Sequence, residues 1–379
     1  MLRQRKETGD NSSVSFKPFA LERLFARWEF RAPHLLSSSD CESLTVKELL
    51  AIAGWSAEAL LDVGLGYTDS QGDPMLRSVI GATHGVNADD IVVCAPAEGI
   101  FLIATALLEP GDRVVVETPC YQSLEELPRR LGCTVVRWPL VETADGWRMD
   151  LDRLDELLAP GTRLLVLNAP HNPTGHLPSR TDMDAIFALA DARGARVLVD
   201  EMYRGLERTS AERLEPACAR NERAVSLGGL SKTHGLPGLR IGWLATRDRP
   251  LVEALIAHKD YTTICASGPT QILARAALEN HDALAARSLD IVAANLERAR
   301  SFIDRHGERF AWREPAAGSV AFMRYTAGSA AAFCERAAEE AGVMVVPSTV
   351  FDFEDAHVRL GLGRRGFAAA LAALEAWIT

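Results

Sequence analysis

Short apolar runs alternate with amphipathic stretches through the middle of the chain. Each run has five or six residues rich in β-branched side chains, and apolar positions at helical spacing follow most of them. Nearly continuous apolar strands separated by helices are typical of a mainly parallel sheet covered on both faces. The pattern therefore predicts an α/β fold. The predicted strands are 91–95, 113–117, 134–138, 163–168, 196–201, 224–229 and 241–245, and the predicted helices include 98–109, 121–132, 180–193 and 249–258.

The pattern changes after residue 268. An Ala- and Leu-rich stretch over 269–305 has heptad-like apolar spacing, which predicts a long helix or a helix pair packed on the main body. Strands at 321–325, 343–347 and 357–363 and helices at 330–341 and 366–378 then predict a smaller α+β domain. We expect a flexible arm (1–19), an N-terminal segment on the small domain and active site (20–45), a large domain (46–268) and a small domain (269–379).

Composition narrows the function classes. The 379 residues are 47% hydrophobic and 24% charged, as in a soluble globular protein, and no apolar run or signal-like start predicts a membrane helix or secretion. The net charge of −10 argues against nucleic acid or an anionic membrane as a partner. The seven cysteines form no CxxC pair and have no metal-ligand spacing, so we expect reduced thiols, no metal site and a cytoplasmic location.

Four short stretches with chemically useful residues lie at or after predicted strand ends, where α/β sheets bind ligands. Taken singly, each has an ordinary interpretation, such as a proline-bracketed turn, a helix cap, a core tyrosine or a surface lysine. Their occurrence together, in this order, is specific. They are TPCYQSL (118–124), NAPHNPTG (168–175), VLVDEMYRG (197–205) and SLGGLSKTHGLPGLRIGW (226–243).

Together, these stretches resemble the class I/II aminotransferases, the fold-type-I enzymes that use pyridoxal 5′-phosphate. The resemblance covers roughly residues 45–379, and its most specific part is KTHGLPGLRIG at 232–242. It implies a mainly parallel seven-stranded sheet covered by helices, with a smaller α+β domain. It also implies a Schiff base on Lys232 and abstraction of the substrate's α-proton, with Lys232, Asp200 and Tyr121 as catalytic residues.

The resemblance also assigns cofactor contacts. The carboxylate of Asp200 keeps the pyridine nitrogen protonated, Asn172 and Tyr203 donate to the phenolate oxygen, and Tyr121 covers the ring. The phosphate is held at a helix N-terminus by the N–H groups of Ala97 and Glu98, with Ser231 and the cation Arg240. Tyr67 is similar to the tyrosine that reaches the phosphate of a neighbouring subunit, which implies a homodimer.

Two positions depart from the family pattern around the phosphate. Gly229 stands where a hydroxyl residue is common, and Pro96 removes one N–H from the phosphate loop. We expect Ser231 or Ser226 to compensate.

Substrate recognition follows from two regions. Arg359 matches the family arginine that binds the substrate α-carboxylate, next to Asn172, whereas Arg364 and Arg365 are expected to form a solvated helix start. The stretch RAPHLLSSSDCESL (31–44), with KDYTTICASGPTQ (259–271), is similar to the branch that contains capreomycidine synthase. There, Ser39, Asp40 and Glu42 are candidates to bind a cationic substrate side chain; the alternative is that SSSD is only a helix N-cap.

The leading interpretation is an aminotransferase that acts on an amino acid and a keto acid, in specialised metabolism. A pyridoxal-phosphate-dependent lyase, cyclase or oxidase acting on arginine or a hydroxyarginine is the first alternative, because the cofactor alone does not decide the fate of the substrate. A non-catalytic scaffold or regulatory domain is the second; the intact catalytic set, and the lack of a basic or helix-turn-helix segment before residue 20, argue against it.

Overall fold

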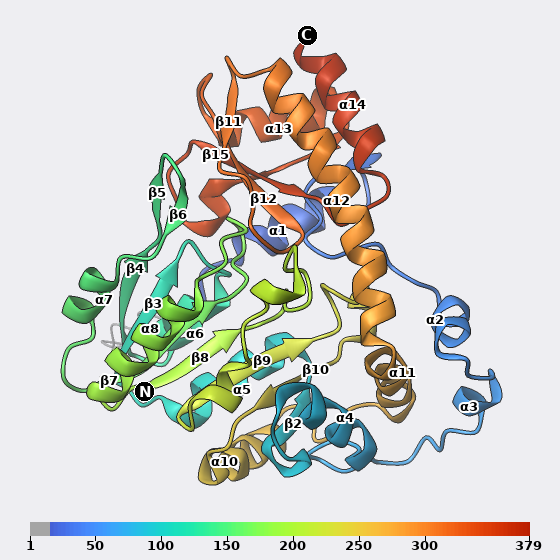
Figure 1. The fold of residues 1–379 in the computed structure, drawn as a ribbon, viewed down its shortest axis with the longest axis vertical. Coiled ribbons are helices and arrows are strands. Elements are labelled where there is room, and N and C mark those ends of the chain that lie inside the picture. Colours follow the sequence, from blue (N-terminus) through green and yellow to red (C-terminus); the bar gives the residue numbers. More distant parts are fainter. Residues whose placement is uncertain (1–15) are drawn as a thin grey trace, which may run out of the picture.

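The computed structural model describes residues 16–379, and a seven-stranded sheet forms its centre (Figure 1). The strand order is β2-β10-β9-β8-β7-β3-β4, in which β10 is antiparallel to both of its neighbours and the other pairs are parallel. Each predicted apolar run is one of these strands, so the predicted fold class is confirmed. The strands are β2 (Ile91–Cys94), β3 (Arg113–Thr118), β4 (Thr134–Pro139), β7 (Thr162–Asn168), β8 (Arg196–Asp200), β9 (Ala224–Gly229) and β10 (Gly242–Ala245).

Helices cover both faces of this sheet because successive strand side chains point to opposite sides. Val114 and Val116 pack into the core beneath α5, α6 and α10, whereas Val115 packs into the core beneath α7 and α8. Strands β2 and β10 also face α2, α4 and α11. The helices of this part are α2 (Val46–Ala53), α3 (Glu58–Leu61), α4 (Pro74–His84), α5 (Pro96–Leu107), α6 (Ser123–Arg130), α7 (Leu151–Leu157), α8 (Arg180–Ala192), α9 (Ala217–Arg220), α10 (Arg249–Lys259) and α11 (Gly268–Glu279).

The Ala- and Leu-rich stretch is a helix pair. Helix α11 ends at Glu279, and α12 (His281–Arg305) runs from the sheet into the upper lobe (Figure 1). A four-stranded sheet there has the order β11-β12-β15-β14. Its neighbours include α13 (Ala330–Glu340), α14 (Phe367–Ile378) and β13 (Val343–Met344), and its strands are β11 (Phe310–Trp312), β12 (Val320–Tyr325), β14 (Val346–Pro347) and β15 (His357–Gly361).

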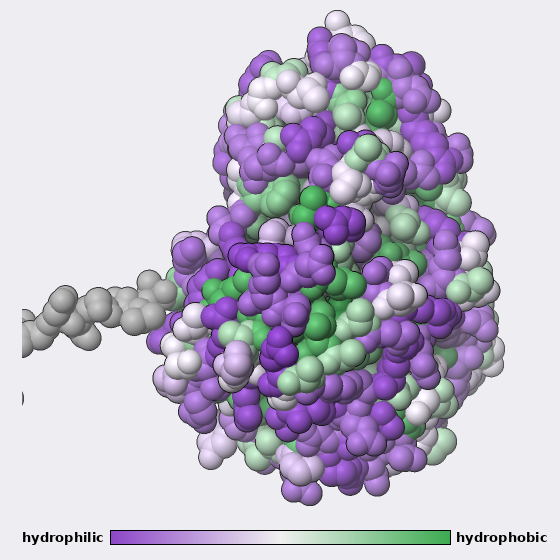
Figure 2. All heavy atoms as spheres, turned by 60° about the vertical axis from the view of Figure 1, so that its left-hand side comes forward, coloured by the Kyte–Doolittle hydropathy of each residue, from purple (hydrophilic) through white to green (hydrophobic). Residues whose placement is uncertain are grey.

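The surface has an upper and a lower lobe, and apolar side chains gather where the two meet (Figure 2). A hairpin of β5 (Val141–Thr143) and β6 (Gly146–Arg148) extends from the lower lobe, and Glu142 on it pairs with Arg324 of β12 at 2.8 Å. Across residues 16–379, the helices lack the unbroken apolar length that a bilayer crossing requires.

The N-terminal segment crosses between the lobes. Helix α1 (Ala20–Trp28) comes first, and β1 (His34–Leu35) then pairs in parallel with β13. Thr45 is the N-cap of α2: its hydroxyl accepts from Glu48 N at 3.2 Å, and the Glu48 carboxylate accepts from Thr45 N at 2.7 Å. The interpretation of SSSD (37–40) as that helix cap is therefore wrong, because the capping box forms five residues later. Most of the expected flexible arm, residues 1–15, lies outside the described residues.

Candidate active site

The carboxyl ends of the central strands open into one cavity. Asn168, the last residue of β7, stands opposite Asp200 on β8, and Asp200 stands opposite Leu227 on β9. Lys232 follows three residues after the end of β9. The cavity has a volume of about 420 Å³. The predicted site residues that line it are Ser39, Asp40, Ala97, Tyr121, Asn172, Asp200, Tyr203, Ser231, Lys232, Arg240 and Arg359.

Lys232 presents its amine to this cavity. Its Nζ donates a hydrogen bond to Ser39 Oγ at 2.8 Å. Burial lowers the pKa of Lys232, and the charge of Arg359 acts in the same direction, although Asp40 and Asp200 oppose both effects. A lowered pKa makes the neutral, nucleophilic form of a lysine amine easier to reach.

Asp200 is the buried carboxyl group of the site. Burial raises its pKa to about 6, although its Oδ1 accepts a hydrogen bond from Met202 N at 3.1 Å. Asn168 joins it to the next loop, because its Nδ2 donates to Asp200 O at 2.7 Å and its Oδ1 accepts from Asn172 N at 2.7 Å. The backbones of Asp200 and Asn172 are thus linked through one side chain.

Arg359 is fully buried on β15. Its Nη1 donates to Asn172 Oδ1 at 3.1 Å, its Nη2 donates to Ser37 O at 2.9 Å, and its guanidinium lies 5.4 Å from the ring centre of Phe351. These contacts hold the arginine at the cavity wall, where its fork suits a carboxylate.

Several polar groups in the cavity wall fit pyridoxal 5′-phosphate. The hydroxyl of Tyr203 is buried and has no hydrogen-bond partner within residues 16–379, and such a group is costly unless a ligand satisfies it. The first N–H groups of α5 have no partner inside the helix and carry its positive dipole end, as a phosphate requires. Ala97 lies in the wall at this end. Arg240 lies in the wall as well, with an exposed side chain.

The structure shows where Glu98, Ser231 and Ser226 lie relative to the cavity. Glu98 is not among the lining residues of the cavity; its carboxylate accepts from Ala95 N at 3.2 Å and Thr263 Oγ1 at 2.8 Å, so its side chain is engaged elsewhere. Of the two serines expected to compensate, Ser231 lines the cavity. Ser226 is fully buried, and its hydroxyl donates to Glu201 Oε1 at 2.8 Å.

The two departures from the family pattern are coupled sterically. A Cβ atom on Gly229 would lie 2.9 Å from Pro96 Cγ and 3.0 Å from Met202 Cε, which is closer than real Cβ contacts allow without a shift. A hydroxyl residue at position 229 therefore conflicts with the proline at the start of α5, and the two differences occur together.

Segment 37–42 passes between the loop of Lys232 and strand β15. Cys41 N donates to Lys232 O at 3.3 Å, and Ser319 Oγ donates to Ser39 O at 2.7 Å. Gly361 permits the passage, since a Cβ atom there would lie 1.9 Å from Ser38 O. Ser39 and Asp40 are placed in the cavity by this close approach.

The two acidic residues of this segment, Asp40 and Glu42, lie in different environments. Asp40 lines the cavity and is ion-paired with Arg364 at 2.5 Å, so Arg364 is a wall residue and the expectation of a solvated helix start fails for it. Glu42 is not among the lining residues, and its carboxylate accepts from Arg365 N at 2.9 Å.

Helix α1 belongs to the segment 20–45 that we expected at the active site, but its wall residues were not among the predicted site residues. Leu21, Glu22, Phe25 and Glu29 line the cavity from one helical face. The hydroxyl of Tyr121 donates to Glu22 Oε1 at 2.9 Å, and burial raises the pKa of Glu29, helped by the charge of Asp40. The amphipathic pattern of FALERLFARWEF (19–30) is the signal that predicts such a helix.

Tyr67 lies outside the cavity. Its side chain is 89% exposed, and other large apolar side chains nearby in sequence are also exposed. They include Leu61 and Leu65, and Tyr261 and Ile264 form a second exposed group along the chain.

The chain is similar to several known proteins. A family model described as "Aminotransferase class I and II" matches residues 36–366. Capreomycidine synthase of Streptomyces vinaceus is 33% identical over 90% of this chain and 89% of that protein. Arginine–pyruvate transaminase of Pseudomonas aeruginosa is 30% identical over 80% of each. A PLP-dependent aminotransferase structure from Streptococcus suis superposes with a TM-score of 0.90 at 28% identity, covering 96% of this chain and 98% of that one.

Proposed function

Because the chain belongs to the class I and II aminotransferase family and is a pyridoxal 5′-phosphate-dependent aminotransferase, we propose that Lys232 carries the cofactor and that Arg359 binds the substrate α-carboxylate. The convergence of Lys232, Asp200 and Arg359 on one cavity is the observation that carries this assignment. Asn172, Tyr203, Tyr121, Ser231, Arg240 and the N–H groups of Ala97 and Glu98 complete the proposed cofactor contacts.

The proposed chemistry divides among these residues. When bound, pyridoxal 5′-phosphate supplies an electron sink that acidifies the substrate's α-carbon. Asp200, buried and with one backbone donor to its carboxylate among residues 16–379, is proposed to hold a proton at the ring nitrogen. Lys232, with its lowered pKa, is proposed to take the α-proton and return it, and Ser39 orients the amine before substrate arrives. Arg359 fixes the carboxylate so that the α-proton faces Lys232.

Substitution of Lys232 by alanine tests the assignment. We expect Lys232→Ala to lose at least about a thousandfold in amino transfer, as expected for removal of a combined nucleophile and base. Borohydride reduction followed by mass spectrometry should find cofactor covalently attached to the wild-type protein and none on the variant. Attachment at an unchanged level in Lys232→Ala would contradict the assignment.

We further propose that the amino donor has a cationic side chain. Glu22 and Glu29 line the cavity without an ion-pair partner among residues 16–379, and Asp40 lies beside them, paired with Arg364. Carboxylates in the wall, with Glu22 exposed and Glu29 partly buried, favour a guanidinium or ammonium group over a neutral one. The likeness to an arginine–pyruvate transaminase supports the same class of substrate.

Paired variants test the charge preference. We expect Glu22→Gln and Glu29→Gln to raise KM for arginine about tenfold each, since a hydrogen bond to a charged group contributes about 1.5–3 kcal/mol. The KM for a neutral amino acid such as methionine should change little. Glu253→Gln, on the exposed face of α10, is the matched control. Equal changes in KM for arginine and methionine would show that the two carboxylates do not recognise the charge of the substrate side chain.

A lyase, cyclase or oxidase reaction on arginine or a hydroxyarginine is the second candidate, supported by the likeness to capreomycidine synthase. Mixing the holoenzyme with arginine or 3-hydroxyarginine, without any keto acid, distinguishes the two. A transaminase should stop after one keto acid per site. Continued turnover would identify the second candidate, and the product mass would tell elimination or cyclisation from oxidation.

Three finer assignments are proposed as well. Exposure of Tyr67 on the outside of the cavity supports a homodimer in which it reaches the neighbouring subunit. The seven cysteines are free thiols, which supports a reducing, cytoplasmic location. The likeness to capreomycidine synthase supports a role in specialised metabolism. The boundaries 20–45, 46–268 and 269–379 remain our proposed domain division.

A further inference from the structure

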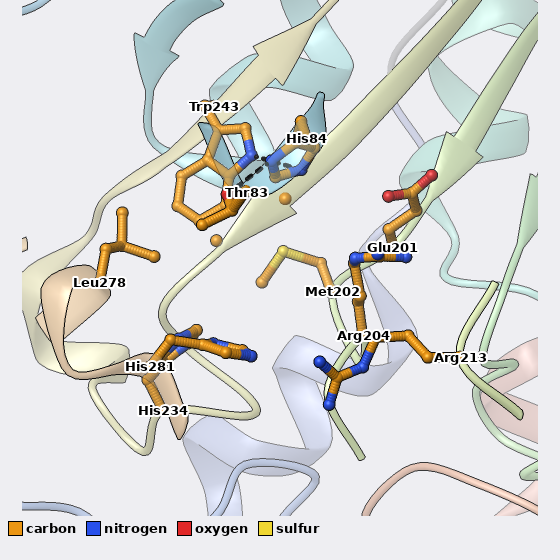
Figure 3. Close-up of a pocket in the computed structure, with 12 residues that line it drawn as sticks. Thr83, His84, Glu201, Met202, Arg204, Arg213, His234, Trp243, Leu278 and His281 are labelled. Atoms are coloured by element: carbon orange, nitrogen blue, oxygen red, sulfur yellow. Dashed lines mark hydrogen bonds between the residues drawn. The ribbon is translucent and has the colours of Figure 1, made fainter. Parts of the chain in front are cut away.

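A second cavity lies directly behind the catalytic one. Its volume is about 210 Å³, and Met202 belongs to the walls of both cavities. Gly228 and Gly229, at the end of the strand that leads to Lys232, form another part of its wall. The remaining lining residues are Thr83, His84, Glu201, Arg204, Arg213, His234, Trp243, Leu278 and His281 (Figure 3).

Two arginines give this cavity a positive charge. Figure 3 shows Arg204 and Arg213 on one side and the rings of His234 and His281 on the other, with Met202 between them in this view. Among the described residues, the guanidinium of Arg204 donates to Leu214 O, and Nε of Arg213 pairs with Glu207 at 3.3 Å. Both guanidinium groups therefore keep further N–H donors for a ligand.

Buried polar atoms without partners point to an occupant. His234 is 4% exposed, its Nε2 shares a hydrogen bond of 3.0 Å with His281 Nδ1, and its Nδ1 has no partner within residues 16–379. Oε2 of Glu201, which is 7% exposed, also has none. The Oε1 atom of Glu201 accepts from Ser226 Oγ and from Ala217 N, each at 2.8 Å, so Oε2 is the oxygen left for a ligand's hydrogen atom.

Arginines supply the positive charge of this wall, and the histidines add none. Burial lowers the pKa of His234 to about 3 and that of His84 to about 4, so both rings are neutral at neutral pH; burial also raises the pKa of Glu201, although Arg204 opposes that shift. His84 is already saturated, since its Nε2 accepts from Trp243 Nε1 at 3.2 Å and its Nδ1 lies 3.0 Å from Ile80 O. Arg204 and Arg213 are consequently the cationic groups of the wall, and Glu207, which pairs with Arg213, is not among the lining residues.

We propose that this second cavity is a binding site for a small oxyanion, either a phosphate or a carboxylate. Arg204 and Arg213 supply the charge, and His234 supplies a buried donor on the opposite wall. Occupation would act on the catalytic cavity through Met202, whose backbone N–H donates to Asp200 Oδ1. The site is separate from the proposed substrate site, because Arg359 and Lys232 do not line it.

Histidine ring signals test the proposal in the wild-type holoenzyme, whose catalytic phosphate contacts are already filled by the cofactor. We would titrate it with inorganic phosphate and, separately, with malonate, while following the ring carbons and protons by NMR. Signals assigned with His281→Gln should shift saturably, and the titration midpoint of His281 should rise in the presence of the anion. Tighter binding of phosphate or of malonate identifies which oxyanion the site prefers.

Variants then locate the anion. Arg213→Gln should weaken the binding followed by the His281 signal at least about tenfold, corresponding to about 1.4 kcal/mol. Arg336→Gln, an exposed arginine of α13, should leave it unchanged. The proposal is overturned if anions change the cofactor absorbance without moving the His281 signal, because they then occupy the catalytic cavity. It is also overturned if no saturable shift occurs at tens of millimolar, which would leave a water-filled cavity.

Discussion

Glu117 is a buried carboxyl group near the end of β3, behind the catalytic loop. Its Oε2 accepts from Asn168 N at 2.9 Å and lies 4.0 Å from His171 Nε2, whereas its Oε1 has no partner within the described residues. Burial raises the pKa of Glu117 to about 8 and lowers that of His171 to about 3. Both side chains are thus neutral at neutral pH, so Glu117 holds the Asn168 backbone without adding charge behind the cavity.

The raised pKa of Glu117 predicts how the free energy of unfolding changes with pH. The folded state holds this proton more tightly than the unfolded state, so its stabilising contribution is complete below pH 4.5 and is lost as the pH rises to about 8. Glu117→Gln removes this loss, and a pKa difference of one corresponds to about 1.4 kcal/mol. Denaturant unfolding at pH 5 and pH 8 should show the variant gaining a few kcal/mol relative to wild type at the higher pH. If the free energies of unfolding of variant and wild type differ by the same amount at both pH values, Glu117 is not a buried, neutral group.

Helix α1 is held over the cavity by contacts with the start of α6. Gln122 Oε1 accepts from Ala20 N at 2.9 Å, Gln122 Nε2 donates to Pro18 O at 3.2 Å, and Glu126 accepts from Lys17 N at 3.1 Å. The buried side chain of Leu21 packs beneath the helix. Few buried residues secure this element, so it belongs to the regions that open at low free-energy cost.

Gln122→Ala should loosen α1 specifically. Two hydrogen bonds of about 1 kcal/mol each are removed, so we expect faster amide exchange over residues 20–28 and a several-fold rise in substrate KM. Hydrogen–deuterium exchange with mass spectrometry measures the first effect, with α14 as an internal reference that should not change. If exchange in α1 stays at the wild-type rate, other contacts hold the helix.

The exposed apolar residues around Tyr67 are explained if a second copy of the chain covers them. Leu65 is 87% exposed and Tyr67 89% exposed, which disfavours an isolated chain in water. We predict that light scattering finds a homodimer, and that Leu65→Arg shifts it towards monomer because an unpaired charge would enter the interface. Tyr67→Phe should keep the dimer but weaken cofactor affinity about tenfold through loss of a hydrogen bond to phosphate.

The matched control is Ala327→Arg, in an exposed turn of the upper lobe, which should stay dimeric. A wild-type protein that scatters as a single chain would contradict the proposed homodimer directly, and so would dissociation caused equally by the control.

Local patterns in the sequence were enough to predict the central sheet and the strand ends that line the cavity. Strand identity depends on short runs of β-branched residues; Asn168 and Asp200 are the last residues of two strands, and Lys232 lies three residues after a third. Parallel strands bring their carboxyl ends to one edge, so the position of these three residues followed from the order of the elements.

Contacts between distant segments decided which other side chains line the cavities, because no local pattern encodes such contacts. The ion pair of Asp40 with Arg364 joins residues 324 positions apart, and it separates Asp40 from Glu42, which the sequence had grouped together. The amphipathic pattern of α1 could have predicted a helix, but only packing shows that Glu22 and Glu29 face the cavity. The second cavity likewise depends on side chains from several elements, whose assembly is set by the packing of the whole fold.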